Sequence, residues 1–445
     1  MVAILNAKPM KRLLAAASAT VLALGGAGLA YSHDEAPGSF RMAGAKPSRP
    51  GRTQLLGHAN PGGYSADVFG YRGHAYLSSW GRRNHCPSLG VRVFSLRNPR
   101  RPSRVGTFAD GRSEPDVRGS WTEKTIVKRV RTPRFTGDLA VTSLQSCTDD
   151  GFQGFGLYDV VNPARPRRLA LVRLEPRGSH EIWLAAHRNR AYVYTAVINS
   201  ELVSSPSFDP RTRDASTPGK ADFRIFDVSD PERPREVGEW GAWRELGVKP
   251  TAGRGRFTRG NFVHSVITNA QLTRAYLSYW DLGTVILDIG DPARPRYLGR
   301  TPAVDDEGDA HSAALARGGR ILIETHENAS GRPYFFDISN PRRPRLVGKF
   351  GPYTPGGEGF ATGVHDAKVI GNRAYFSWYS RGVLVADISN PRKPRLVARF
   401  VPTRTADPVG GTCETPCTLT WGVYATRGYV LASDIVSGLW VFRIR

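Results

Sequence analysis

Four histidines occupy one register of a repeated pattern and have the side-chain chemistry to bind a transition metal. His180 and His264 each lie twelve residues before a tyrosine of the next predicted strand, and His365 lies ten residues before its tyrosine. His311 holds the same place in the unit between those of His264 and His365. Imidazole nitrogens are common ligands of zinc, copper and iron. We therefore treat His180, His264, His311 and His365 as candidate metal ligands.

Three carboxylates accompany these histidines. Glu181 and Asp366 each directly follow one of them, and Asp309 lies two residues before another. Carboxylates commonly accept a hydrogen bond from the far nitrogen of a ligating imidazole and so fix its orientation. We expect Glu181, Asp309 and Asp366 in this supporting role. The sequence leaves open whether the metal is copper, zinc or iron, and whether any cofactor is bound at all.

Local catalytic signatures are absent from the sequence. It contains no Gly-x-Ser-x-Gly nucleophile motif, no phosphate-binding loop and no dinucleotide-binding fingerprint. The pair His180-Glu181 also lacks a second histidine at the spacing of zinc proteases. Because some sites are assembled from distant loops, these absences leave open whether the chain is an enzyme.

The elements that position the histidines follow from a repeated turn. Residues 387–397 read Asp-Ile-Ser-Asn-Pro-Arg-Lys-Pro-Arg-Leu-Val, and residues 337–347 repeat this almost unchanged. The preceding run, such as Val383-Leu384-Val385, is apolar and β-branched, which favours a strand. Asn-Pro then starts a tight turn, and the second proline keeps the chain extended as it enters the next strand. Each copy therefore predicts two antiparallel strands joined by a rigid turn.

The spacing of the copies predicts an all-β fold, a seven-bladed β-propeller of four-stranded antiparallel blades over residues 51–445. The turn prolines recur every 49 to 68 residues, and two further strands precede each copy. The predicted third strands of the blades lie around Val93, Leu157, Ile225, Ile286, Phe335, Val385 and Val441. The last unit lacks a fourth strand, and Gln54–His58 is a surplus strand at the start. We expect this N-terminal strand to pair with Trp440–Ile444 and close the ring.

The third strands and the aspartate that follows them resemble the LVIVD-repeat family. Val383-Leu384-Val385-Ala386-Asp387 and Val285-Ile286-Leu287-Asp288 carry the resemblance, which extends over roughly residues 51 to 445. The family is similar to exported or surface β-propellers, most of which have no assigned activity. The resemblance therefore implies the scaffold rather than a reaction.

In such a ring the four histidines head the innermost strands of successive blades and could meet at the mouth of the central channel. Trp121, Trp421 and Ala66 are expected at this place in three other blades. The same face receives the longer loops, in residues 198–221, 241–261, 351–362 and 401–418. Because variable loops on a rigid scaffold usually carry binding, we expect a small ligand or a protein partner here.

A structural role for the histidines is the competing interpretation. In WD40-type propellers a histidine, a serine or threonine and an aspartate form a network within the blade. The corresponding triplets in this sequence are His264, Ser278, Asp288 and His365, Ser377, Asp387.

The N-terminus predicts export. Lys8, Lys11 and Arg12 precede an apolar run that ends near Leu24, and small residues lead to a cleavage point after Ala30. We expect residues 1–30 to be a signal peptide and residues 31–50 a flexible leader, and thus a secreted protein. No later segment is apolar enough to span a membrane.

Four cysteines in an exported chain favour disulfides. Cys86 and Cys147 fall in the same loop of adjacent blades, and Cys413 and Cys417 flank three residues. We expect the pairs Cys86–Cys147 and Cys413–Cys417, although four cysteines allow three pairings. A Cys-x-x-x-Cys metal site is the alternative for the second pair.

The chain is strongly basic, with a formal net charge of +23. Much of the excess falls in the proline turns, on the face opposite the histidines, at Arg100, Arg101, Arg104, Arg165, Arg167, Arg168, Arg233, Arg235, Arg294, Arg296, Arg342, Arg343, Arg345, Arg392, Lys393 and Arg395. Such a surface would attract an anionic cell-wall polymer, unless arginine serves only solubility. Specific nucleic-acid binding is not expected, because no recognition motif occurs.

These observations give three candidate functions. The first is a secreted propeller that binds a ligand or partner through its loop-rich face. The second is a metal-dependent oxidoreductase or hydrolase that uses the histidines. The third is an envelope-attached scaffold held by its arginine-rich face.

Overall fold

The computed structural model describes most of the chain after its N-terminal region. The described residues are 53–82, 85–174, 178–197, 221–250, 252–254, 260–304, 308–327, 331–351, 363–403 and 418–445. The predicted signal peptide and leader lie outside these residues, as do Cys413, Cys417 and most of the long loops expected beside the histidines.

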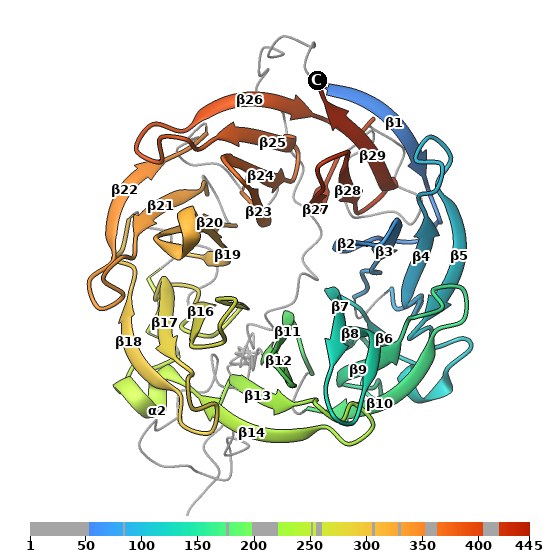
Figure 1. Ribbon diagram of the computed structural model, residues 1–445, viewed down its shortest axis with the longest axis horizontal. Coiled ribbons are helices and arrows are strands. Elements are labelled where there is room, and N and C mark those ends of the chain that lie inside the picture. The colour runs from blue at the N-terminus through green and yellow to red at the C-terminus, as the bar shows by residue number, and fades with distance from the viewer. Residues whose placement is uncertain are drawn as a thin grey trace, which may run out of the picture.

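Seven antiparallel sheets form a closed ring around a central channel, which confirms the predicted seven-bladed β-propeller (Figure 1). The ring is closed by β1 (Thr53–Ala59), which pairs with β29 (Gly438–Ile444) as the outer strand of the last blade. Gln54 lies opposite Arg443, and His58 lies opposite Trp440. The predicted closure is therefore correct, and it removes the open edge that an unpaired strand would present.

The blades follow one another along the chain, each with its innermost strand first. The first contains β2 (Val68–Tyr71), β3 (His74–Leu77), β4 (Val91–Ser95) and β5 (Ser103–Phe108). The second contains β6 (Ser120–Trp121), β7 (Thr125–Arg131), β8 (Thr136–Ser146), β9 (Gly154–Asp159) and β10 (Arg167–Arg173). The third contains β11 (Ile182–His187), β12 (Arg190–Ala196), β13 (Phe223–Asp227) and β14 (Arg235–Trp240).

The remaining blades repeat this order. The fourth contains β15 (Ser265–Thr268), β16 (Arg274–Ser278), β17 (Thr284–Asp288) and β18 (Arg296–Arg300). The fifth contains β19 (Ala310–Ala316), β20 (Ile321–His326), β21 (Tyr334–Asp337) and β22 (Arg345–Lys349). The sixth contains β23 (Asp366–Ile370), β24 (Arg373–Trp378), β25 (Gly382–Asp387) and β26 (Arg395–Phe400). The last contains β27 (Thr420–Ala425), β28 (Val430–Asp434), β29 and β1.

Helical structure in the described residues is limited to three short segments. The helix α2 (Ala242–Leu246) follows the third blade, and η1 (Pro115–Val117) and η2 (Arg317–Gly319) are single turns of 3-10 helix. None of the helices in the described residues is both long and apolar enough to cross a membrane.

The repeated turns form through the side-chain chemistry expected from the sequence. Asn340 and Asn390 each accept, through Oδ1, a hydrogen bond from the backbone N–H two residues later, at 3.1 Å in both cases. The aspartate at the end of the third strand does the same, as in Asp387, which accepts from the N–H of Ser389 at 2.8 Å. These bonds hold the turn without the help of other blades.

A close backbone contact docks the turn of each blade on the blade before it. Five fourth strands carry a glycine at this contact, namely Gly57, Gly106, Gly238, Gly299 and Gly348. A Cβ atom on Gly238 would lie only 1.9 Å from the carbonyl oxygen of Pro292 in the next blade. The second and sixth blades carry Ala170 and Ala398 at this place. Small residues here let the proline turn approach the neighbouring strand.

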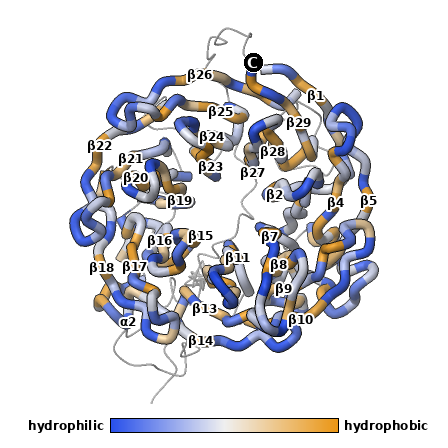
Figure 2. Tube along the Cα trace, in the orientation of Figure 1, coloured by the Kyte–Doolittle hydropathy of each residue, from blue (hydrophilic) through white to orange (hydrophobic). Residues whose placement is uncertain are grey.

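The hydrophobic core lies between adjacent blades. One cluster combines Tyr194 and Phe223 of the third blade with Leu277 and Leu287 of the fourth. Figure 2 shows hydrophobic residues along the strands and hydrophilic residues at the turns around the rim. Burial of these sheet faces against one another makes the ring a rigid frame for the residues at its centre.

Cys86 and Cys147 form a disulfide with a Cα–Cα distance of 5.6 Å, in agreement with the pairing expected from the sequence. The bridge joins loops of the first and second blades beside Trp80 and Trp121 at the channel.

Candidate metal centre

The innermost strands bring equivalent residues to the channel in a common register. The backbone N–H groups of Ala66, His264 and His365 each donate to the carbonyl oxygen of a serine on the second strand of the same blade, at 2.8 to 3.0 Å. These three positions are equivalent around the ring, as the sequence pattern predicted.

The second blade places a carboxylate in this register. Ser143 Oγ accepts a hydrogen bond from the N–H of Lys124 at 3.0 Å, and Ser377 Oγ accepts from the N–H of Asp366 at the same distance. Lys124 therefore corresponds to Asp366. Glu123, one residue earlier, corresponds to the histidine of the sixth blade.

The expectation that Trp121 would occupy this position is wrong. The innermost strand of the second blade is interrupted, because β6 ends at Trp121 and β7 begins only at Thr125, although both pair with β8. Because of the interruption, the register position is occupied by Glu123, two residues after Trp121.

The network expected from WD40-type propellers is replaced by local contacts of the aspartates. Asp288 Oδ2 accepts a hydrogen bond from Arg296 at 2.8 Å, and Asp387 Oδ2 accepts from Arg395 at 3.2 Å. Both aspartates thus belong to the turn between the third and fourth strands of their own blade. The histidines face the channel instead of these aspartates.

The four histidines form a continuous arc across four successive blades. The ring centroids of His180 and His264 are 4.3 Å apart, those of His264 and His311 are 4.0 Å apart, and those of His311 and His365 are 4.4 Å apart. All four side chains are buried. The structure therefore brings together the four residues that the sequence singled out.

Two histidines of this arc and a neighbouring glutamate form a group that could hold a metal ion. The ligand atoms of His264, His311 and Glu327 all lie within 4.8 Å of one another, and all three residues are buried. Glu327 directly follows β20, and its Oε2 lies 3.3 Å from Nε2 of His311. Two imidazoles and a carboxylate can hold zinc or iron(II) and leave coordination positions open.

Contacts around this group orient its ligand atoms. His311 Nδ1 lies 2.5 Å from the backbone carbonyl oxygen of His365, which can only accept. Nδ1 therefore carries a proton, and Nε2 lies on the side of Glu327. The hydroxyl of Tyr379 donates to Oε1 of Glu327 and holds that carboxylate in place.

His180 extends the arc through a contact between two imidazoles. Its Nε2 lies 2.8 Å from Nε2 of His264, and its Nδ1 lies 2.8 Å from the side-chain amide of Gln145. Two ring nitrogens at this distance require either a proton on one of them or a cation bound to both. The amide of Gln145 can satisfy His180 in either state, since it offers both a donor and an acceptor.

A layer of buried acids surrounds a single lysine next to the histidines. Lys124 Nζ lies 2.5 Å from Glu181 Oε2. It also lies 3.7 Å from Oδ2 of Asp67 and 3.7 Å from Oδ2 of Asp366. Lys368 makes a further ion pair with Asp366. Glu181 and Asp366, expected to support a metal ligand, therefore bind this cation. Asp309 is also buried, beside the fifth blade's innermost strand.

Burial and mutual repulsion shift the ionisation of these groups. Burial raises the pKa of Glu181 to about 7, although Lys124 partly opposes the change. Burial also raises the pKa of Glu327 to about 8, with a further contribution from the charge of Glu181 and an opposing one from the hydroxyl of Tyr379. Burial disfavours the charge of Lys124, but the surrounding carboxylates outweigh this and raise its pKa well above the usual value.

Glu123 closes the arc on the side opposite His180. Its Oε1 accepts a hydrogen bond from Trp421 Nε1 at 2.7 Å and lies 3.6 Å from Nε2 of His365. Burial raises the pKa of Glu123 well above its usual value, and the nearby Glu181 adds to the shift. Its second oxygen, Oε2, is buried without a hydrogen-bond partner among the described residues. The channel thus contains an acceptor that a bound water or ion would satisfy.

Sequence reasoning missed Glu327, Glu123 and Lys124. Glu327 follows its strand by one residue and has no counterpart that the repeat makes visible. The pair Glu123-Lys124 could have been found by its place just before the β-branched run Thr125-Ile126-Val127, as Glu181 also directly precedes an apolar run. The spacing from Trp121 concealed this relation.

Comparison with known proteins agrees with this architecture. Seven four-stranded blades define the chain as a seven-bladed β-propeller. The LVIVD repeat family matches residues 363–401, which span the sixth blade. The chain thus carries an LVIVD repeat, as the sequence pattern predicted, and its fold is consistent with an LVIVD-repeat propeller. A search of curated proteins found no match.

Solved structures show the same fold at low sequence identity. Raptor from Chaetomium thermophilum is 13% identical with a TM-score of 0.57, and the match covers 88% of this chain and 29% of that one. The β-propeller domain of Cps50 (Swd1) from Myceliophteria thermophila is 12% identical with a TM-score of 0.53, covering 88% of this chain and all of that domain. The present chain spans less than a third of Raptor. These likenesses concern the fold alone.

Proposed function

We propose that this propeller binds a divalent transition-metal ion at the channel, through His264, His311 and Glu327. The observation that carries the proposal is the convergence of three buried ligand atoms within 4.8 Å of one another. Support comes from the protonation of His311, whose Nδ1 faces a carbonyl oxygen and whose Nε2 is directed to the site. Zinc and iron(II) fit this donor set best, and copper fits if the further imidazoles join.

The remaining residues of the arc would complete or tune the site. His180 and His365 lie beside the proposed ligands and could become further ligands after a small change of side-chain rotamer. Tyr379 would hold Glu327 and could pass a proton to or from its carboxylate. A bound metal would supply Lewis acidity or redox chemistry, and the chain would supply orientation and a buried setting.

The ligand or partner proposed for the loop-rich face would reach this centre from the channel mouth. We propose that the protein acts outside the cytoplasm, since the disulfide between Cys86 and Cys147 favours an oxidising compartment. The predicted cleavage after Ala30 is checked by N-terminal sequencing of the exported protein, which should begin at Tyr31.

A metal-free polar cluster is the second candidate, and one observation favours it. The contact between His180 and His264 can be an ordinary hydrogen bond, and Lys124 already supplies a cation to the acid layer. The protein would then be a binding module whose histidines only shape the channel.

Titration of metal-stripped protein with Co(II) and Zn(II), followed by calorimetry and visible absorption, separates the two candidates. We expect one ion per chain, and at least a tenfold loss of affinity in both His311→Gln and Glu327→Gln. His74→Gln, which changes a half-buried histidine at the turn between β2 and β3 of the first blade, is the control and should bind normally. Absence of stoichiometric binding in the wild type would contradict the metal proposal.

A further inference from the structure

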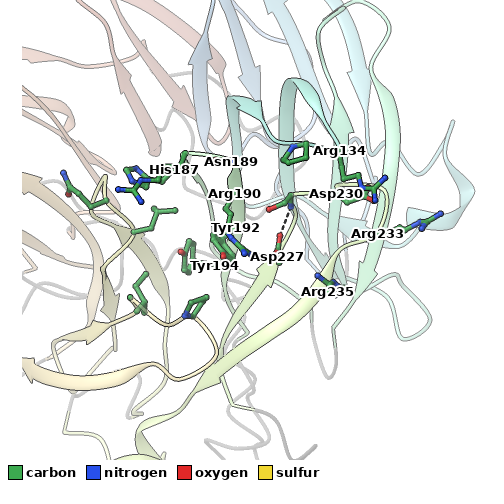
Figure 3. Close-up of a pocket in the computed structure, with 18 residues that line it drawn as sticks. Arg134, His187, Asn189, Arg190, Tyr192, Tyr194, Asp227, Asp230, Arg233 and Arg235 are labelled. Atoms are coloured by element: carbon green, nitrogen blue, oxygen red, sulfur yellow. Dashed lines mark hydrogen bonds and ion pairs between the residues drawn. The ribbon is translucent and has the colours of Figure 1, made fainter.

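A cleft of about 890 Å³ opens on the face that carries the proline turns, and none of the four histidines of the arc lines it (Figure 3). Its walls are the turns between β7 and β8, β11 and β12, β13 and β14, β15 and β16, and β17 and β18. Three neighbouring blades therefore contribute to one hollow. The first-to-second and third-to-fourth turns of these blades thus lie on one face of the ring.

The cleft is lined by more cationic than anionic side chains. Five arginines contribute, namely Arg134, Arg188, Arg190, Arg233 and Arg235, and His187 stands at one side. The two carboxylates, Asp227 and Asp230, are engaged in the local turn, where each accepts a backbone N–H two residues later. Figure 3 shows Arg134 and Arg233 on the side opposite His187, with Tyr192 and Tyr194 between them.

The third blade differs from its neighbours in how its turn arginine is paired. In the fourth, fifth and sixth blades the aspartate of the third strand binds the arginine directly opposite, as in Asp288 with Arg296 at 2.8 Å. The equivalent pair in the third blade is Asp227 and Arg235, which lie opposite each other in the ladder. Asp227 instead contacts Arg190 at 3.5 Å.

This exchange leaves Arg235 available to a ligand. Within the part of the chain that the structure describes, only Arg190 of the five arginines has a carboxylate within ion-pair distance. Arg134, Arg188, Arg233 and Arg235 are all exposed. A cleft with several uncompensated guanidinium groups attracts oxyanions, and arginine's planar fork matches phosphate and carboxylate oxygens.

We infer that this cleft is a specific site for an anionic carbohydrate polymer, whose phosphate or carboxylate groups bind the arginines. The inference does not depend on a metal in the channel. A cleft of about 890 Å³ accommodates a few units of such a polymer, whereas the rest of the arginine-rich face is spread over separate turns. The net positive charge attracts an anionic polymer to the whole face, and the cleft provides a defined place for it to bind.

Nucleic acid fits the cleft less well. Binding of single strands usually relies on exposed aromatic rings that stack on bases, but Tyr192 is 8% exposed and Tyr194 is 1% exposed. The disulfide also favours a compartment in which nucleic acid is scarce. The exposed arginines offer charge and hydrogen bonds, which suit the phosphate or carboxylate groups of a charged saccharide.

Matched double variants of the full exported chain test the inference. Arg233→Gln with Arg235→Gln removes two charges from the cleft, and Arg343→Gln with Arg345→Gln removes two charges from the same turn of the fifth blade, outside the cleft. Binding is measured to phosphorylated dextran, to polygalacturonate, to neutral dextran and to duplex DNA at about 0.15 M salt. Circular dichroism confirms that both variants are folded.

We expect at least one of the two anionic carbohydrates to bind the wild type. The cleft variant should lose at least tenfold in affinity, and the fifth-blade variant less than threefold. The polymer that responds distinguishes phosphate from carboxylate as the recognised group. Equal losses in the two variants would show a diffuse charge effect and overturn the site. A selective loss for DNA alone would overturn the carbohydrate assignment.

Discussion

The channel centre and the turn-face cleft carry charge in opposite ways. At the channel, carboxylates and Lys124 are buried and compensate one another at short distance. In the cleft, the arginines are exposed, and most have no carboxylate nearby among the described residues. Buried charges require defined partners, so the channel can select an ion of fixed geometry. Exposed charges are screened over about 10 Å at 0.1 M salt, so the cleft favours a flexible anion.

The ring makes this division possible. The innermost strands bring one residue from each blade toward a common axis, where the side chains are buried. The outer turns repeat the Asn-Pro or Asp-Pro motif and project their arginines outward. The same repeat therefore produces a buried site at its centre and a basic surface at its rim.

The largest expected effect concerns the cation of the acid layer. Lys124→Met leaves Glu181, Asp67 and Asp366 without the charge that they share, so we expect the free energy of unfolding to fall by about 3–5 kcal/mol. Lys368→Met is the matched control, since Lys368 contacts Asp366 alone and its side chain is 26% exposed; we expect a loss below about 1 kcal/mol. Urea denaturation measures both. Equal losses of unfolding free energy would contradict the claim that Lys124 stabilises the buried carboxylates more than Lys368 does.

The next prediction changes a close backbone contact beside the cleft and the equivalent contact away from it. Gly238→Val would push against Pro292, whose turn lines the cleft. Gly348→Val would push against Pro391, where a Cβ atom would lie 2.1 Å from the carbonyl oxygen, away from the cleft. We expect each to cost about 1–3 kcal/mol of stability through overpacking.

Binding distinguishes these two glycine variants. Only Gly238→Val should weaken polymer binding at the cleft, and neither should change the stoichiometry of metal binding. Gly428→Ala, where an added Cβ meets nothing within 4 Å, controls for the substitution itself and should be neutral. If Gly348→Val weakened polymer binding as strongly, the cleft would not be a local site.

A separate expected effect is a pH dependence at Asp222, a buried acid held by hydrogen bonds. Asp222 accepts from the N–H of Val263 at 2.8 Å and from the hydroxyl of Tyr279 at 3.0 Å. Burial raises the pKa of Asp222 to about 7, from 3.8 for the exposed group. Because the folded-state pKa is raised, its contribution to stability is complete below pH 3.8 and is lost as the pH rises to about 7.

Asp222→Asn removes this titration. The unfolding free energy of the wild type should decline between about pH 4 and 7 relative to that of the variant, with a slope of at most about 1.4 kcal/mol per pH unit. Denaturation at a series of pH values measures the difference. Parallel curves would mean that Asp222 titrates alike in the folded and unfolded chains.

The fold could be predicted almost completely because residues close together in the sequence determine each turn and its two strands. Each turn carries its own prolines and its own Asn or Asp acceptor, so one copy of the motif indicates two strands, and the spacing indicates the blades. The closing strand was predictable from an imbalance, a missing fourth strand at one end and a surplus one at the other. These features depend on few contacts between distant residues.

The candidate site was predictable only where the repeat extends to it. The four histidines stand in one register, and the symmetry of the ring carries them to one arc. Glu327 lies beyond the end of a strand, and Glu123 follows an interrupted strand, so neither obeys the repeat. Lys124 became recognisable as a central cation only when the structure brought together carboxylates from three other blades.

The central claim is that His264, His311 and Glu327 share one metal ion. Anomalous X-ray diffraction from crystals of zinc-loaded protein, recorded on both sides of the zinc absorption edge, tests it most directly. We predict a single strong peak within about 2.0–2.2 Å of a nitrogen of each histidine and an oxygen of Glu327. A channel without an anomalous peak, or a peak bound elsewhere with these three side chains hydrogen-bonded to one another, would contradict the claim.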